Sequence, residues 1–142
     1  MRQLYNMAMD KVQKFTLGTK IVIVEDDKFL GGLVSKKLME EGCVVRHIET
    51  GESAQAAFDA ETPDLIFLDL LLPGMSGFDV LANLKKNDKT KNLPVILLSN
   101  LGERDDIRRG MDLGATSFLI KASMTVDSII NEASRILRIR RK

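Results

Sequence analysis

The sequence predicts an α/β domain in which a parallel sheet is covered by helices on both faces. Short apolar runs alternate with longer amphipathic segments five times along the chain. The short runs are almost continuously hydrophobic, which is typical of parallel strands that are buried on both sides. At 142 residues, the chain has the length of one domain.

Each of the five expected strands is a short run rich in Val, Ile, Leu and Phe, bounded by polar residues or glycine. Because the runs are short and separated by helical patterns, they favour strands over buried helix segments. The expected strands cover residues 21–24, 43–48, 65–68, 95–98 and 117–120.

Apolar residues recur at helical spacing between and after these strands. In the last helical segment, Val126, Ile129, Ile130, Ala133 and Leu137 fall on one stripe. The expected helices run from Leu30 to Gly42, over 51–60, between the Pro73-Gly74 turn and the polar stretch 87–92, over 103–113, and over 126–137.

Residues 1–18 precede this pattern as an N-terminal extension, and residues 19–142 form the domain with its basic C-terminal end. The extension has Leu4, Ala8, Val12 and Phe15 at helical spacing. Three interpretations stay open for it: an extra helix packed on the domain or on a second copy, a frayed tail, or a cloning remnant.

Charge is distributed unevenly, because residues 21–134 carry 12 basic and 19 acidic side chains. Such an acidic body is a poor surface for nucleic acid, and the arginines of 135–142 are expected to complete the last helix. No apolar run reaches the length of a membrane helix, and the single cysteine, Cys43, cannot form an internal disulfide. We therefore expect a cytoplasmic protein that binds neither membrane nor nucleic acid.

Chemically reactive side chains follow four of the five expected strands. The acidic run 25–27 follows the first strand, Asp69 the third, Ser99 the fourth and Lys121 the fifth. Open parallel sheets place their functional residues at the carboxyl ends of the strands. The sequence therefore predicts that these groups converge at one edge of the sheet.

This combination predicts phosphoryl transfer onto Asp69. Neighbouring carboxylates repel each other by roughly 4 kcal/mol per pair at 4 Å and an effective dielectric near 20, and Mg²⁺ offsets that repulsion. Lys121 and Ser99 supply an ammonium and a hydroxyl for phosphoryl oxygens, and an aspartate can act as the nucleophile.

The sequence lacks the motifs of several other classes of phosphate- and nucleotide-binding protein. There is no phosphate-binding GxxxxGK[ST] loop and no GxGxxG after a strand, which disfavours an NTPase or a dinucleotide oxidoreductase. A dehalogenase-type phosphatase needs a second aspartate where Leu71 stands, and the run 25–27 would repel the phosphate of FMN. His47 and Cys43 are interpreted as structural residues, with His47 expected to lie away from the acidic cluster.

Four segments in order carry a family resemblance: IVIVEDD (21–27), LIFLDLLLPGMSGFDVL (65–81), LPVILLS (93–99) and GATSFLIK (114–121). Over about residues 19–139 the chain resembles a response-regulator receiver domain of two-component signalling, without a fused output domain. The resemblance implies a doubly wound (βα)5 fold of the flavodoxin type, with strand order 2-1-3-4-5.

The resemblance also implies roles for individual residues. It makes Asp69 the phosphoacceptor and gives Lys121 a contact with the phosphoryl group. It makes Glu25 and Asp26 the acidic pair that holds Mg²⁺, or Mn²⁺ in its place, directly or through water. With Asp69 and the backbone carbonyl of Leu71, this pair completes the protein part of the metal site.

A switch is implied as well, with Ser99 as its hydroxyl residue and Phe118 as its aromatic residue. Phosphorylation remodels the surface formed by the fourth helix, the fifth strand and the last helix. The implied partners are a histidine kinase or phosphotransfer protein, a downstream protein target and, in some relatives, a second copy of the chain. Such a protein is not an enzyme in the usual sense, since it catalyses only its own phosphorylation and autodephosphorylation.

The chain departs from the family pattern at three positions. Ala122 stands where proline is usual, Ser76 where an acid is common, and Asn100 where a small apolar residue follows the hydroxyl. These departures leave a second interpretation open: a pseudo-receiver that acts as a constitutive interaction module. Leu71 and Leu101, which match positions that influence hydrolysis in the family, predict slow autodephosphorylation.

Overall fold

One parallel sheet of five strands, in the order β2-β1-β3-β4-β5, forms the centre of the molecule. The computed structural model describes residues 13–101 and 103–140. The predicted fold class and strand order are confirmed, and each predicted strand is within one residue of the observed one at either end. The strands are β1 (Lys20–Val24), β2 (Val44–Ile48), β3 (Leu65–Leu68), β4 (Val95–Ser99) and β5 (Ser117–Ile120).

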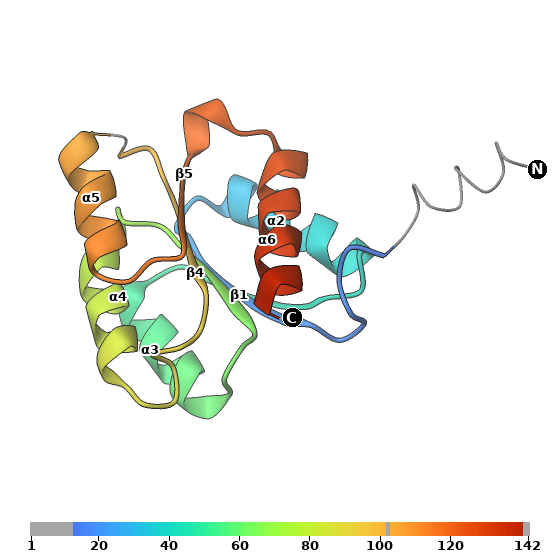
Figure 1. The fold of residues 1–142 in the computed structure, drawn as a ribbon, viewed down its shortest axis with the longest axis horizontal. Helices are drawn as coiled ribbons and strands as arrows, with labels where there is room; N and C mark the ends of the chain where they lie inside the picture. The colour runs from blue at the N-terminus through green and yellow to red at the C-terminus, as the bar shows by residue number, and fades with distance from the viewer. Residues whose placement is uncertain (1–12, 102, 141–142) are drawn as a thin grey trace, which may run out of the picture.

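Helices cover both faces of the sheet, as predicted: α2 and α6 lie on one side, and α3, α4 and α5 on the other (Figure 1). A short 3-10 helix, η1, follows β5 and was not expected from the sequence. The helices are α2 (Lys28–Glu40), α3 (Gly51–Ala60), α4 (Gly77–Lys86), α5 (Arg104–Asp112), η1 (Lys121–Ser123) and α6 (Val126–Arg140).

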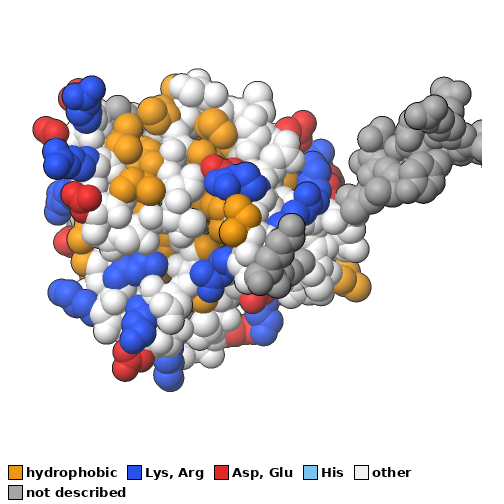
Figure 2. Space-filling view, in the orientation of Figure 1, with side chains coloured by type: hydrophobic (Ala, Val, Ile, Leu, Met, Phe, Trp, Pro, Cys, Tyr) orange, Lys and Arg blue, Asp and Glu red, His pale blue; other side chains and the backbone are white. Residues whose placement is uncertain are grey.

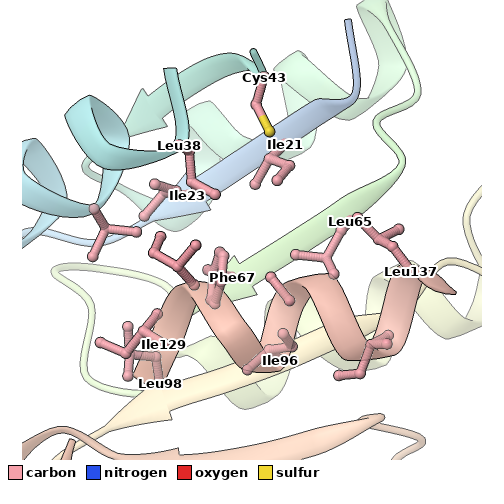
Figure 3. Close-up of a cluster of buried hydrophobic side chains, with 14 of the residues drawn as sticks. Ile21, Ile23, Leu38, Cys43, Leu65, Phe67, Ile96, Leu98, Ile129 and Leu137 are labelled. Carbon is pink, nitrogen blue, oxygen red and sulfur yellow. The ribbon is translucent and has the colours of Figure 1, made fainter. Parts of the chain in front are cut away.

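Alternate residues of each strand supply two separate hydrophobic layers. On β1, Ile21 and Ile23 join the layer beneath α2 and α6, whereas Val22 and Val24 join the layer beneath α3 and α4. Figure 3 shows the first layer, with side chains of the sheet packed against α6 and Leu38 of α2. Burial on both faces explains why the strands read as continuous apolar runs.

The described part of the N-terminal extension packs against the domain. Phe15 is 2% exposed and belongs to the same buried cluster as Leu137. The Ser134 hydroxyl of α6 donates a hydrogen bond to the backbone carbonyl of Lys14 at 2.9 Å. Phe15 is not in a helix, so the interpretation of the extension as a helix is wrong at this residue. Leu4, Ala8 and Val12, on which that interpretation also depends, lie outside the described residues.

Parallel pairing brings the carboxyl ends of β1, β3, β4 and β5 to one edge of the sheet. The chain segments that follow these strands therefore lie side by side, as the sequence predicts. Across residues 13–101 and 103–140, none of the helices is both long enough and apolar enough to cross a membrane.

The segment after β3 is fixed by a close approach to the start of α4. The Gly77 amide donates a hydrogen bond to the Leu70 carbonyl at 3.0 Å. A Cβ atom at Gly77 would lie 2.1 Å from the Asp69 carbonyl oxygen and 2.6 Å from the Leu70 Cα. Only glycine fits here, because both obstacles are backbone atoms.

We expect Gly77→Ala to lower the free energy of unfolding by about 2 to 3 kcal/mol, since extra atoms in a packed site displace their surroundings. Gly32→Ala is the control, because a Cβ at Gly32 meets no atom within 4 Å. Alanine has the higher helix propensity, so this control should gain up to about 1 kcal/mol. Urea unfolding measures both, and equal stability of the two variants would contradict the packing argument.

Candidate functional site

Three carboxylates meet at the carboxyl edge of the sheet, together with one lysine. An oxygen of each of Glu25, Asp26 and Asp69 lies within 4.8 Å of the others. Glu25 is 2% exposed and Asp69 is 4% exposed, whereas Asp26 is open to solvent. We call these three residues and Lys121 the acidic pocket.

The sheet positions the two buried carboxylates through backbone hydrogen bonds. Glu25 directly follows β1, and its amide donates to the Ile48 carbonyl of β2 at 2.8 Å. Asp69 directly follows β3, and its amide donates to the Val24 carbonyl of β1 at 3.0 Å. Each acid thus continues the hydrogen-bond pattern of a strand by one residue, which fixes the origin of its side chain.

Asp27, the third acid of the run 25–27, has a different role. Its side chain accepts hydrogen bonds from the amides of Phe29 at 3.0 Å and Leu30 at 3.2 Å and thereby caps α2. Asp commonly occupies this position, because its carboxylate satisfies amides that the first turn leaves unpaired. The cap fixes the point at which the chain leaves the acidic pocket.

Lys121 bridges the two buried carboxylates. Its ammonium lies 2.7 Å from Asp69 Oδ2 and also contacts the Glu25 carboxylate. Burial lowers the pKa of Lys121, but the hydrogen bonds to Asp69 and Glu25 outweigh it, so the pKa is raised above its ordinary value. Lys121 therefore stays positively charged and offsets part of the repulsion between the two acids.

Glu25 holds a proton more tightly than an exposed glutamate. Burial is the largest cause and raises the pKa of Glu25 to about 7, opposed by the hydrogen bond from Lys121 and reinforced by Asp69. A carboxyl group that is removed from water and set beside a second carboxylate favours its neutral form.

Of the remaining predicted site residues, Leu71 bonds to the acidic pocket, whereas Ser99 and Phe118 belong to β4 and β5. The Ser99 hydroxyl is buried and accepts a hydrogen bond from the Leu101 amide at 3.3 Å; within residues 13–101 and 103–140 it has no hydrogen bond to the pocket. The Leu71 amide donates to Asp69 Oδ1 at 3.1 Å, while the Leu71 side chain is 55% exposed. Phe118 is partly exposed on β5 and packs against the layer beneath α3 and α4.

The loop that presents Lys121 forms η1, which contains Ala122. No peptide bond among the described residues is cis, in keeping with the alanine at this position.

His47 is closer to the site than expected from the sequence. Its Nε2 atom lies 2.8 Å from the backbone carbonyl oxygen of Glu25, so the expectation that it lies away from the acidic cluster is wrong. The reason is register: β2 pairs with β1 so that His47 is opposite Ile23, two residues before Glu25. No sequence pattern reports this pairing, although Gly31 within the expected helix is a signal of a close neighbour, and a Cβ there would meet the His47 ring.

The pocket has the donors that a divalent cation requires. Three carboxylates and one ammonium leave an excess of negative charge when all are ionised. Hard cations such as Mg²⁺ prefer oxygen ligands and use one or two carboxylates plus water and phosphate oxygens. Exposed Asp26 and buried Glu25 and Asp69 therefore fit a metal site that opens to solvent on one side.

Comparison with known proteins gives a consistent match. The sequence model described as "Response regulator receiver domain" matches residues 21–133. The phosphate regulon transcriptional regulatory protein PhoB of Rhizobium meliloti is 36% identical over 106 residues, which are 75% of this chain and 47% of PhoB. The transcriptional regulator RpaA of Synechocystis is 35% identical over 119 residues, which are 84% of this chain and 49% of RpaA. The chain thus spans about half the length of these relatives.

Solved structures agree in fold. The signal receiver domain of a putative LuxO repressor protein from Vibrio parahaemolyticus has a TM-score of 0.79 and 32% identity, covering 87% of this chain and 92% of that one. The Mn²⁺-bound form of response regulator Rcp1 has a TM-score of 0.72 and 28% identity, covering 80% of this chain and 90% of that one.

We expect the metal-free protein to lose stability as the pH rises through 7. The pKa of Glu25 is about 7 in the folded protein and 4.5 in an exposed glutamate, so its contribution is complete below pH 4.5 and disappears as the carboxyl ionises in the fold. Between pH 5 and 8, the free energy of unfolding should fall by about 2 kcal/mol more than in Glu25→Gln, which cannot ionise. Urea unfolding in EDTA checks this, and parallel pH curves for the two proteins would contradict it.

Proposed function

The chain belongs to the response-regulator receiver domain family, and we propose that its Asp69 accepts a phosphoryl group from a histidine kinase or phosphotransfer protein in a Mg²⁺-dependent reaction. Receiver domains are signalling modules of two-component systems and not classical enzymes. The observation that carries the proposal is the buried Asp69 carboxylate, which lies 2.7 Å from the Lys121 ammonium and within 4.8 Å of the Glu25 and Asp26 carboxylates.

In the proposed reaction, a carboxylate oxygen of Asp69 attacks the phosphorus of the donor and an acyl phosphate forms. The bond between phosphorus and the donor nitrogen or oxygen breaks, and the donor leaves with its electron pair. Lys121 is close enough to Asp69 to contact an oxygen of the incoming group, where its fixed charge stabilises developing negative charge. The Leu71 amide, which donates to Asp69 Oδ1, orients the nucleophile.

Glu25, Asp26 and Asp69 would hold the metal through side-chain oxygens, with the Leu71 backbone carbonyl as a fourth protein ligand. A bound divalent cation would neutralise phosphoryl oxygens and carboxylates that otherwise repel each other. The Mn²⁺-bound structure of Rcp1, a neighbour in fold, supports a divalent site and makes Mn²⁺ a suitable substitute.

The output of the switch is proposed to be the surface formed by α5, β5 and α6, which responds through Ser99 and Phe118. Hydrophobic side chains gather on the molecular surface between α5 and β5 (Figure 2). Ile107 and Met111 of α5 and Phe118 of β5 are each partly or largely exposed. A change in the position of Phe118 would alter this apolar surface and therefore its affinity for a downstream protein or a second copy of the chain.

A pseudo-receiver that acts without phosphorylation is the alternative, and the complete set of pocket residues argues against it. Ala122 and Asn100 depart from the family pattern but remove no charged group from the pocket. A cytoplasmic location follows from the proposed kinase partner and stays a prediction. Residues 19–142 are proposed to form the receiver domain, with residues 1–18 as an N-terminal extension.

We expect acetyl phosphate and Mg²⁺ to add one phosphoryl group to the protein, seen as a gain in intact mass that EDTA prevents. Asp69→Asn should abolish the gain, because an amide is not a nucleophile at this position. Asp27→Asn is the matched control: asparagine also caps helices, so this variant loses one nearby charge but keeps both the fold and the nucleophile.

Two further results decide between the proposed function and the pseudo-receiver. With beryllofluoride and Mg²⁺, NMR shifts that spread from the acidic pocket to Phe118 and α6 would support the switch. No phosphoryl gain in the wild-type protein, or labelling that persists in Asp69→Asn, would overturn the proposal.

We expect Leu71→Asn to shorten the lifetime of the phosphorylated protein. The exposed Leu71 side chain offers no hydrogen bond to an attacking water, whereas asparagine can hold and orient one. One ordinary hydrogen bond corresponds to an effect of about five-fold. Phosphate release followed in the presence of Mg²⁺ measures the lifetime, with Leu71→Met as the apolar control; equal lifetimes for both variants would contradict slow hydrolysis through Leu71.

A further inference from the structure

We propose that His47 is a positioning residue for the metal-binding acids, because its imidazole holds the backbone of Glu25 in place. The inference rests on the proposed metal-dependent function and concerns a residue for which the receiver resemblance implies no role. It stands on three observations: the hydrogen bond of the ring, the fit of the ring beneath α2, and the charge of the loop that it restrains.

The hydrogen bond assigns the proton on the ring. His47 Nε2 lies 2.8 Å from the Glu25 carbonyl oxygen, and a carbonyl oxygen only accepts, so Nε2 is the donor. The Glu25 amide donates to the carbonyl of the next residue of β2, Ile48, at 2.8 Å. Both backbone groups of Glu25 are therefore held by β2, although β1 itself ends at Val24. The His47 side chain replaces a backbone donor that the end of the strand lacks.

The ring is held tightly by α2. His47 and Val45 share one side of β2, and a Cβ at Gly31 would lie 2.2 Å from both Cε1 and Nε2 of His47. The next residue, Gly32, meets no atom within 4 Å of a Cβ. The glycine at 31 thus makes room for the imidazole, whereas the glycine at 32 does not serve this contact.

The restrained loop is the one that carries the repelling charges. Glu25 and Asp26 belong to the acidic pocket, and the Asp27 amide donates to the Glu25 carboxylate at 3.3 Å. Carboxylates this close repel each other, and a displacement of the loop backbone would let them separate. The bond from His47 opposes this movement, so the ligands stay close together before a cation arrives and less ordering is required on binding.

Two variants of equal length separate the hydrogen bond from the packing. His47→Gln keeps an N–H donor at a similar distance from the backbone. His47→Met has a side chain as long and as flexible as that of glutamine but has no hydrogen-bond donor. We expect His47→Met to raise the Mg²⁺ dissociation constant about five-fold, as for the loss of one hydrogen bond, and His47→Gln to stay within about two-fold of the wild type. Isothermal titration calorimetry on the unphosphorylated full chain measures these dissociation constants and does not depend on phosphorylation of Asp69.

A second measurement separates positioning from a general loss of structure. In acetyl phosphate reactions, His47→Met should need more Mg²⁺ for half-maximal labelling but reach the wild-type rate when Mg²⁺ is saturating. Val45→Ala is the control, since Val45 lies on the same side of β2 and packs against the core. It should lower the free energy of unfolding and leave the Mg²⁺ constant unchanged.

The outcomes distinguish this inference from the proposed function. If the wild-type protein binds Mg²⁺ and is labelled on Asp69, but His47→Met and His47→Gln bind Mg²⁺ equally well, the positioning role is wrong and the function stands. If Val45→Ala weakens Mg²⁺ binding as much as His47→Met, the effect belongs to the fold and the inference also fails. If the wild-type protein neither binds Mg²⁺ nor is labelled, the proposed function itself fails.

Discussion

The ammonium of Lys121 is the charge on which the arrangement of the site depends. It contacts the carboxylates of both Glu25 and Asp69, which are almost completely buried and close enough to repel each other. Without this cation, two ionised acids would face one another in a poorly solvated space, where repulsion is stronger than in water. Burial, reinforced by Asp69 and only partly opposed by Lys121, keeps the pKa of Glu25 near 7. The negative charge that Lys121 does not offset gives the pocket an affinity for a further cation.

The fold makes this concentration of charge tolerable by fixing the backbone beneath it. Glu25 and Asp69 each extend a parallel ladder by one residue, and the segment after Asp69 is held against the first residue of α4, Gly77. Two hydrophobic layers, one on each face of the sheet, stabilise these strands, and the repelling carboxylates of the acidic pocket lie at one edge of the sheet. Packing in these two layers therefore stabilises the fold against the repulsion between the charged groups at the strand ends.

Asp27 and His47 differ in whether their contacts are local in the chain or depend on the fold. Asp27 caps a helix that begins at the next residue, an interaction between near neighbours that the sequence contains directly. The His47 contact joins residues 22 positions apart and depends on which strands pair and in which register. Phe15 is a similar case, because its helical spacing with earlier residues gives no sign that its side chain enters the core beside α6.

The sequence by itself determined the fold class, the strands and helices to within a few residues, and the convergence of Glu25, Asp69, Ser99 and Lys121 on one edge. The elements follow from the periodicity of hydrophobic residues along the chain. The convergence follows because the carboxyl ends of parallel strands lie at the same edge of a sheet. Only the tertiary structure decided that Lys121 bridges Glu25 and Asp69, that Ser99 bonds to Leu101 and not to the pocket, and that His47 holds the Glu25 carbonyl. The physical reason is that hydrogen bonds and ion pairs act over about 3 Å, so they depend on strand register and helix position, which arise when the whole chain packs.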